Sequence, residues 1–318
     1  MVACSSDGDD DADTSAASTT SATVDGDGVY PTSIDTKFGE VVIDEAPQRV
    51  VALGWGDAET ALALGVQPVG ASDWLGFEGD GVGPWVTQSY SESPEILGTT
   101  ELDYEAIAAL NPDLILDVRS SGDQDRYDTL SAIAPTVGVP VDGDNYLTTR
   151  EQQVKMIAAA LGKTEEGEQE LASVDDRIAE IRDAHPEWSD QTISVLAKSA
   201  EEWAAYTAGD ARADLLLDLG FQENPWVAEQ AASEDSFYLG LSPENLGEAN
   251  SDVVVALPIS GDAAELENDP AWQALPAVID GKAIVVDGDL AQAFSLGTVE
   301  ATLWALDTLE TQLAEITA

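Results

Sequence analysis

The sequence predicts an α/β fold of two similar lobes with mostly parallel sheets, joined by one long rigid helix. Short apolar runs alternate with amphipathic segments along most of the 318 residues, a pattern typical of parallel strands covered by helices. Residues 102–118 (LDYEAIAALNPDLILDV) are echoed by residues 241–257 (LSPENLGEANSDVVVAL). One helical stretch, residues 149–184, separates the two copies. Because the copies lie too far apart for a solenoid and at the spacing of a domain, we expect two lobes with a cleft between them.

The chain divides into four predicted parts. Residues 1–30 are dominated by Ser, Thr, Asp, Gly and Ala, and such a segment buries too little surface to offset its ordering entropy, so we predict a disordered tether. Cys4 is the only cysteine, and its place after small or aliphatic residues and before the tether resembles a lipoprotein attachment site. The other predicted parts are an N-terminal lobe over 31–148, a linking helical segment over 149–186 and a C-terminal lobe over 187–318.

The N-terminal lobe begins with two short alternating runs around Phe38 and Gly39, which predict a small hairpin. Gly65 is expected to end the first predicted helix of this lobe, residues 57–64, because helices are commonly followed by a glycine. The C-terminal lobe resumes the alternation at 192–197 and closes on a helix over 298–316. In the N-terminal lobe, apolar runs predict strands over 50–53, 68–72, 113–118 and 136–141. Helical periodicity predicts helices over 57–64, 102–111 and 126–134.

In the linking segment, the sequence predicts a helix over about 149–184, interrupted near Gly162 and Gly167. Since twenty helical residues span about 30 Å, such a rod would join two lobes more rigidly than a Gly/Ser linker. Apolar residues at spacings of three and four draw one stripe along its second half: Leu171, Val174, Ile178 and Ile181.

The charge balance is extreme, with 62 acidic against 12 basic residues and a formal net charge of −50. Such a surface repels the phosphates of nucleic acids and anionic membranes, so both partners are disfavoured. His185 is the only histidine, which excludes a Ser-His-Asp triad and argues against histidine-lined metal sites. We therefore expect no metal site made of the protein's own side chains.

Six segments follow one another in an informative order: APQRVVALGWGDAETALALGVQPVGASDW, LGTTELDYEAIAALNPDLIL, YDTLSAIAPTV, LLLDLGF, LSPENLGEANSDVVVAL and WQALPAVIDGKAIVVD. Together they resemble the iron-siderophore substrate-binding lipoproteins of ABC importers, the helical-backbone, class III group of periplasmic-binding-protein-like receptors. The resemblance covers about residue 33 to the C-terminus. It implies two Rossmann-like lobes bridged by one long helix, a ligand in a shallow cleft between them, and little hinge closure.

The resemblance also implies a function. It points to an extracytoplasmic receptor, anchored through lipid on Cys4 to the outer face of the cell membrane, that captures a ferric siderophore and delivers it to an ABC permease dimer. No bond chemistry and no covalently bound cofactor are implied, because ferric iron is carried within the siderophore, and we expect a monomer. The net charge of −50 favours a neutral or cationic complex such as a ferric trihydroxamate. Haem or a cobalamin-like corrinoid is the alternative ligand.

A bulky, oxygen-rich ligand needs aromatic walls and a few donors on the loops at strand ends. A guanidinium fork suits paired oxygens, so Arg119 and Arg212 are expected at the iron-ligating oxygens, with Arg126 and Arg150 as substitutes. Each aromatic could instead pack inside its own lobe, and each arginine could form a surface ion pair. The predicted ligand-binding residues are Trp55, Trp74, Arg119, Tyr146, Trp203, Tyr206, Arg212, Tyr238 and Phe294, with Trp85, Trp226 and Phe237 as further candidates.

Glu105 and Glu244 occupy equivalent places in the repeat and are expected to open matching helices. The helix dipole alone would explain a glutamate there, whereas the family resemblance implies docking onto arginines of the permease. The alternative from a different functional class is a secreted hydrolase. Asp57 and Asp73 are expected on adjacent strand-end loops, and two nearby carboxylates could catalyse glycoside hydrolysis.

Overall fold

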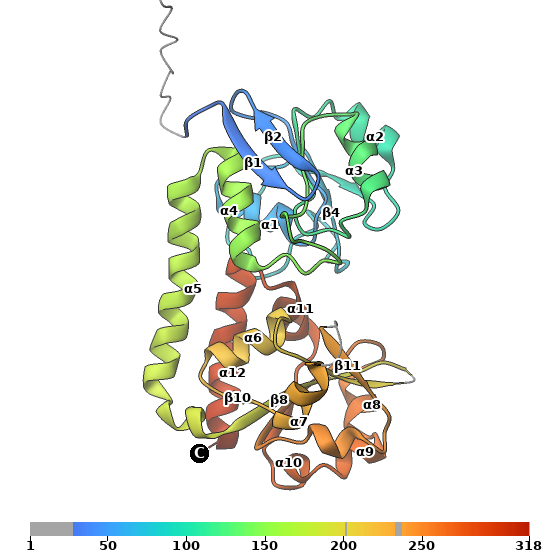
Figure 1. The fold of residues 1–318 in the computed structure, drawn as a ribbon, viewed down its shortest axis with the longest axis vertical. Helices are drawn as coiled ribbons and strands as arrows, with labels where there is room; N and C mark the ends of the chain where they lie inside the picture. Colours follow the sequence, from blue (N-terminus) through green and yellow to red (C-terminus); the bar gives the residue numbers. More distant parts are fainter. Residues whose placement is uncertain (1–27, 201, 233–236, 318) are drawn as a thin grey trace, which may run out of the picture.

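The computed structural model describes residues 28–200, 202–232 and 237–317. Two lobes are stacked along the long axis of the molecule, as Figure 1 shows, and the predicted α/β fold of two lobes is confirmed. Cys4 and nearly all of the predicted tether lie outside the described residues. Within these ranges, none of the helices combines the length and the apolar character that crossing a bilayer requires.

The N-terminal lobe is built on an all-parallel sheet with the strand order β5-β4-β3-β6-β7. The predicted hairpin is present as β1 (Thr32–Thr36) and β2 (Gly39–Ile43). β5 was not predicted, because two of its three residues are exposed and give no buried run. The sheet strands are β3 (Val50–Ala52), β4 (Gly70–Ser72), β5 (Glu95–Leu97), β6 (Leu114–Leu116) and β7 (Thr136–Val137), and the helices are α1 (Asp57–Ala63), α2 (Tyr104–Ala109) and α3 (Gln124–Ser131).

The C-terminal lobe has a mixed sheet with the order β11-β9-β8-β12-β13, and β10 pairs with β8. β8, β12 and β13 run parallel, whereas β9 is antiparallel to both β8 and β11. Only four residues separate β8 from β9, too few for the crossover that parallel neighbours need. The strands are β8 (Thr192–Lys198), β9 (Trp203–Tyr206), β10 (Gln222–Glu223), β11 (Tyr238–Leu241), β12 (Val253–Pro258) and β13 (Ala283–Val285), and the helices are α6 (Ala211–Asp218), α7 (Pro225–Ala231), α8 (Ala263–Glu267), α9 (Pro270–Gln273), α10 (Pro276–Ile279) and α11 (Gly288–Leu296).

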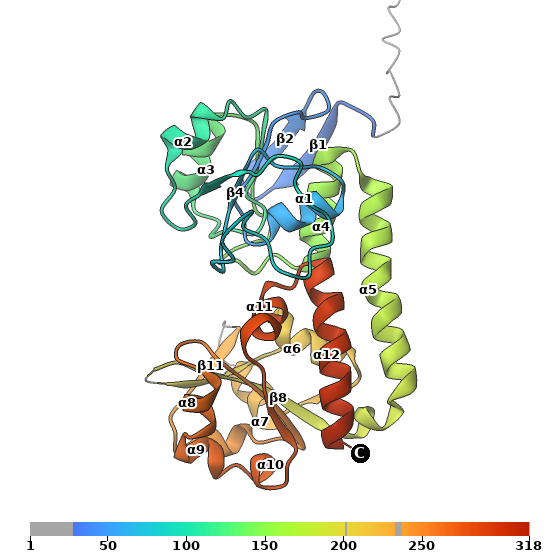
Figure 2. The same ribbon diagram turned by 180° about the vertical axis from the view of Figure 1, so that it is seen from behind.

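The predicted rod between the lobes is two helices, α4 (Arg150–Leu161) and α5 (Thr164–Ala184). α4 ends at Gly162, which adopts the left-handed conformation. Gly167 was expected to interrupt the rod but lies inside α5. A glycine suits this position because a Cβ there would come within 2.6 Å of the Ala158 Cβ on α4. α12 (Val299–Thr317) runs beside α5 in both views, as Figures 1 and 2 show. The predicted apolar stripe of α5 packs into the C-lobe core through Val174, Ile178 and Ile181.

The two lobes anchor their central strands in the same way. The Asp113 carboxylate accepts hydrogen bonds from the backbone N–H groups of Gln48 and Arg49, both at 2.8 Å, just before β3. The Asp252 carboxylate accepts one from the backbone N–H of Thr192 at 2.8 Å, at the start of β8. Because Asp113 and Asp252 are aligned in the sequence repeat, that repeat corresponds to equivalent positions in the two lobes.

Candidate ligand-binding site

A cavity of about 280 Å³ lies between the lobes. The loops after β3 and β6 contribute to its N-lobe wall, which agrees with the rule that ligands gather at the carboxyl ends of parallel strands. The start of α6 forms much of the opposite wall. Four of the predicted ligand-binding residues line this cavity: Trp55, Arg119, Tyr146 and Arg212.

Trp55 follows β3 and forms part of the aromatic wall. Its ring is stacked parallel to that of Trp74, with ring centroids 6.0 Å apart and an interplanar angle of 5°. Trp74 does not line the cavity but stacks on Trp55, and its Nε1 donates to the Leu53 carbonyl at 2.9 Å.

Next to Trp55, Gly56 has a φ of 80°, and a Cβ there would lie 2.6 Å from the methyl group of Thr298. A glycine is therefore needed where the two lobes approach each other.

Tyr146 reaches the cavity through an unusual turn. Asn145 and Tyr146 both have positive φ angles, 47° and 64°, in the left-handed region that is unfavourable for residues with a side chain. The backbone N–H of Tyr146 donates to the Ser120 carbonyl at 2.9 Å. This turn places the Tyr146 ring edge-on to Trp74 and Trp55, with centroids 5.3 Å and 6.5 Å away. Strained backbone of this kind is often found at binding sites.

Arg119 follows β6 and is the most unusual charge of the cavity. The residue is buried, yet it forms no ion pair with any described residue. Its Nε donates to the Tyr146 carbonyl at 3.1 Å, and its Nη1 donates to the Leu296 carbonyl at 2.6 Å. Burial, helped by the nearby Arg212, lowers the pKa of Arg119 to about 10, so the group stays charged at neutral pH. Leu296 ends α11, so an N-lobe cation meets the negative end of a C-lobe helix.

Two further arginines share the cavity. Arg212 is paired with Asp210, whose carboxylate accepts from Nε at 2.8 Å and from Nη2 at 2.7 Å. Its guanidinium also lies 3.6 Å above the Tyr206 ring. The charge of Arg212 is thus balanced inside its own lobe. Arg150, expected only as a substitute, lines the cavity at the first position of α4 and donates to Thr302 Oγ1 at 3.2 Å.

The predicted roles of Trp203 and Phe294 as ligand contacts are wrong. Trp203 is 1% exposed because it lies in β9 and stacks on Trp272 in the lobe core, with centroids 6.1 Å apart. Phe294 is 2% exposed and lies in α11 rather than in a loop. Tyr206 does not line the cavity but lies under Arg212. Tyr238 is exposed at the start of β11, outside the cavity, and its neighbour Phe237 lines the cavity instead.

The other candidates have structural roles. Arg126 forms a buried ion pair with Asp117 at 2.7 Å. Trp85 is buried at the junction of the lobes, and Trp226 packs against the core of the C-terminal lobe. None of these three candidates lines the cavity.

The sequence reasoning missed acidic residues of the cavity wall. Asp210, Asp214 and Asp218 all line it and follow one another at a spacing of four, from the N-cap residue of α6 to its last residue. That spacing places side chains on one face of a helix, so the sequence contained the signal. Burial raises the pKa of both Asp214 and Asp218. Arg119 and Arg150, which have no ion pair with a described residue, thus lie near carboxylates of the C-terminal lobe, Asp210 and Asp218 respectively.

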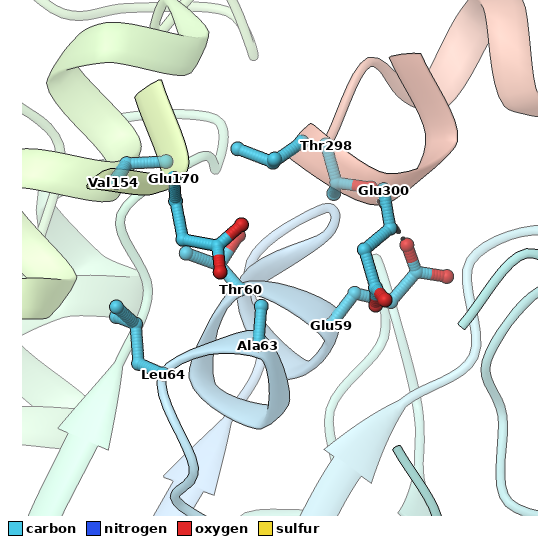
Figure 3. A pocket seen from close by; sticks show the side chains of 9 residues that line it. Glu59, Thr60, Ala63, Leu64, Val154, Glu170, Thr298 and Glu300 are labelled. Atoms are coloured by element: carbon cyan, nitrogen blue, oxygen red, sulfur yellow. Dashed lines mark hydrogen bonds between the residues drawn. The ribbon is translucent and has the colours of Figure 1, made fainter. Parts of the chain in front are cut away.

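A second, much smaller hollow lies where the lobes meet. Figure 3 shows Glu59, Glu170 and Glu300 around it, from α1, α5 and α12. Its volume of about 10 Å³ holds at most about one water. Glu59 accepts hydrogen bonds from Trp85 Nε1 at 2.9 Å and from Thr298 Oγ1 at 2.8 Å, and so ties the two lobes together. In the described part of the chain, no cluster of His, Cys, Asp or Glu side chains could hold a metal ion.

The carboxylates expected for a hydrolase do not form an acid pair. Asp57 is fully buried. The Asp73 carboxylate accepts hydrogen bonds from the backbone N–H groups of Gly76, Phe77 and Glu78 at 2.8–3.0 Å. Neither residue lines the cavity, so this pair cannot act on a ligand held there.

The two glutamates expected to dock on a permease are both exposed. Glu105 lies in the first turn of α2. Glu244 lies in a turn before the short 3₁₀ helix Leu246–Ala249, so the expectation that both open matching helices is wrong for Glu244. A glutamate outside a helix gains little from a helix dipole, which removes the alternative explanation for Glu244.

Residues 50–290 match the periplasmic binding protein family. The chain belongs to that family. Among relatives of known sequence, it is 29% identical to the Probable siderophore-binding lipoprotein YfiY of Bacillus subtilis, over 83% of this chain and 82% of the relative. Two solved structures agree with the fold and are 28% identical to this chain in sequence. Streptococcus pneumoniae PiaA in complex with ferrichrome has a TM-score of 0.74, covering 90% of this chain and 98% of PiaA. Staphylococcus aureus SirA complexed with staphyloferrin B has a TM-score of 0.71, covering 89% and 98%.

Proposed function

We propose that this chain is an extracytoplasmic receptor that captures a ferric siderophore in the cavity between its lobes and delivers it to an ABC permease dimer. The observation that carries the proposal is Arg119, a buried guanidinium without an ion pair in the described residues, at the wall of an interlobe cavity. Such a cation binds a ligand's anionic oxygens strongly, because it need not first leave another ion. The iron-ligating oxygens of a siderophore are ligands of this kind.

The aromatic wall and the relatives support the same proposal. Trp55 and Tyr146 offer flat surfaces on which a bulky chelate can rest. Relatives of 28% identity carry ferrichrome in one case and staphyloferrin B in another, so membership of the family leaves the siderophore class open. The ferric trihydroxamate favoured by the net charge stays a prediction. In this proposal iron arrives inside the siderophore, the receptor is a monomer without a covalently bound cofactor, and it performs no bond chemistry.

The proposal includes two further interactions. Lipid on Cys4 would hold the receptor at the outer face of the cell membrane, in line with the lipoprotein named among the relatives. Glu105 and Glu244, one exposed carboxylate from each lobe, would dock on arginines of the permease.

Quenching of tryptophan fluorescence tests ligand capture directly, since the chain has eight tryptophans, of which Trp55 lines the cavity and Trp74 stacks against Trp55. The panel is ferric hydroxamates, ferric catecholates, ferric citrate, haem and cobalamin. We expect saturable quenching by one class of ferric siderophore at submicromolar concentration. Tight binding of haem or cobalamin alone would replace the proposed ligand, and a lack of response to the whole panel would contradict ligand capture.

Permease docking needs a separate test. The double variant Glu105→Ala, Glu244→Ala should lose nearly all siderophore uptake in cells that carry the cognate permease, while its affinity for the ligand in solution stays unchanged. A matched control removes another exposed glutamate from each lobe, Glu45 and Glu229, and should transport normally. Loss of solution affinity in the first variant, or normal uptake by it, would refute the docking role.

A further inference from the structure

Asp57 is a buried carboxylate whose partners are all neutral N–H groups. It is the first residue of α1, is fully buried and forms no ion pair with a described residue. Its Oδ2 accepts from the backbone N–H of Val118 at 2.8 Å, and its Oδ1 accepts from Gln153 Nε2 at 2.6 Å. The backbone N–H of Arg119 also donates to it. A carboxylate accepts from all these donors, whereas an amide would turn a donor of its own toward them.

The partners of Asp57 form the frame of the cavity's N-lobe wall. The backbone N–H of Trp55 donates to the Arg119 carbonyl at 2.8 Å, and Gln153 Nε2 also donates to the Trp55 carbonyl at 2.8 Å. Gly54 leaves the space that this arrangement needs, because a Cβ there would lie 2.2 Å from Asp57 Oδ2 and 2.9 Å from the Arg119 nitrogen. One carboxylate therefore holds the loop after β3 and the loop after β6, directly or through Gln153.

We propose that Asp57 is a positioning residue of the binding site, which contacts no ligand and fixes the loops of Trp55 and Arg119 so that ring and guanidinium face the cavity. The inference rests on the proposed function of the cavity. Glu59, on the same helix, provides the contrast. Its carboxylate is also buried, but it accepts from Trp85 and Thr298 at the junction of the lobes.

The protonation state of Asp57 gives the proposal a distinctive signature. Burial raises the pKa of Asp57 to about 6, and Asp117 adds to this, while the hydrogen bonds that Asp57 accepts act against it. The charged groups near it are Asp117, which is paired with Arg126 of α3, and Arg119. Gln153 of α4 is neutral. Protonation turns one acceptor oxygen into an O–H that faces N–H groups, so acidification through about pH 6 should release one anchor of the wall.

Amide hydrogen exchange measured by NMR tests the positioning without any ligand. In Asp57→Asn, we expect the amides of Val118 and Arg119 to exchange at least about tenfold faster than in the wild type at pH 7. Glu59→Gln, the matched buried carboxylate on the same helix, should leave both amides protected. Unchanged exchange of these amides in Asp57→Asn would overturn the proposal.

A pH series on the wild-type protein makes the same test without a variant that could fail to fold. After correction for intrinsic exchange, the protection of Val118 and Arg119 should fall between pH 7 and pH 5. The Thr192 amide is the internal reference, because it is bound by Asp252, and the hydrogen bonds from Thr192 lower the pKa of Asp252. Protection that stays constant at Val118 and Arg119 as it does at Thr192 would also overturn the proposal.

Binding of ferrichrome as a probe connects positioning with function. The dissociation constant of the wild type should rise about tenfold from pH 7 to pH 5 with a midpoint near 6, whereas that of Asp57→Asn should be weaker at neutral pH and nearly independent of pH. Glu59→Gln should keep the pH dependence of the wild type. A flat wild-type profile would overturn the positioning role. If the wild type binds no siderophore of the panel, the proposed function fails, while the exchange experiments still decide what Asp57 does.

Discussion

The two lobes share a framework but contribute differently to the cavity. In both lobes, a central strand with a parallel neighbour is anchored by an aspartate of the repeat, Asp113 or Asp252. In the N-terminal lobe, the chain leaves β3 through Trp55 and enters α1, so this aromatic side chain reaches the cavity. In the C-terminal lobe, β8 turns into the antiparallel β9, which buries Trp203 in the core. The connection after the central strand therefore decides whether an aromatic residue there can meet a ligand.

The arginines of the two lobes differ in the same way. Arg119 of the N-terminal lobe and Arg212 of the C-terminal lobe both line the cavity. Arg212 is balanced by Asp210, whereas Arg119 donates to two carbonyl oxygens, lies over the Trp55 ring and has no ion pair with a described residue. The charge of Arg212 is thus neutralised by a neighbouring carboxylate, whereas the charge of Arg119 remains available to a ligand. We expect the N-terminal lobe to supply most of the attraction for anionic oxygens.

The largest expected effect separates the two tryptophans. Trp203→Ala should lower the free energy of unfolding by about 3–5 kcal/mol, the usual cost of removing a buried aromatic side chain, and should leave the cavity wall intact. Trp55→Ala should cost much less stability, since its side chain is only partly buried, but should weaken ligand binding about tenfold or more. Urea denaturation and fluorescence quenching measure the two quantities. Comparable stability losses in the two variants would contradict the contrast between the lobes.

The arginine pair comes next in size. Arg119→Ala should weaken siderophore binding about 100-fold, or about 2.7 kcal/mol, and Arg212→Ala about tenfold, or about 1.4 kcal/mol. The smaller effect is expected because Arg212 is already paired with Asp210. Titration calorimetry gives the affinities, and Arg119→Lys, which keeps the charge but loses the fork, distinguishes charge from geometry. Equal losses for the two alanine variants would show that the ion pair with Asp210 does not reduce the role of Arg212.

The sequence predicted the frame of this fold better than its site, for physical reasons. Buried strands and the apolar stripe of α5 follow from local periodicity, which the packing then confirmed. The direction of β9 depends on how long the connection after β8 is, and so Trp203 could not be placed from its position after a strand alone. The same limit applies to Arg119 and Arg212, since only the folded structure shows which arginine has a carboxylate partner. Asp57, expected at most in a hydrolase, is instead buried behind the cavity.

The smallest effect tests what the lobes have in common. Asp113→Ala and Asp252→Ala should each cost about 1–2 kcal/mol, toward the lower end of what hydrogen bonds to charged groups contribute, because both residues are exposed, and neither should change ligand affinity. The hydrogen bonds from Thr192 lower the pKa of Asp252, so its contribution is present above the ordinary aspartate pKa of about 3.9 and is lost as the pH falls through the lowered value. The stability difference between Asp252→Ala and the wild type should therefore shrink in acid. Urea denaturation at pH 7 and at pH 3 measures it, and a clearly larger cost in one lobe than in the other would show that the repeated aspartates are not equivalent anchors.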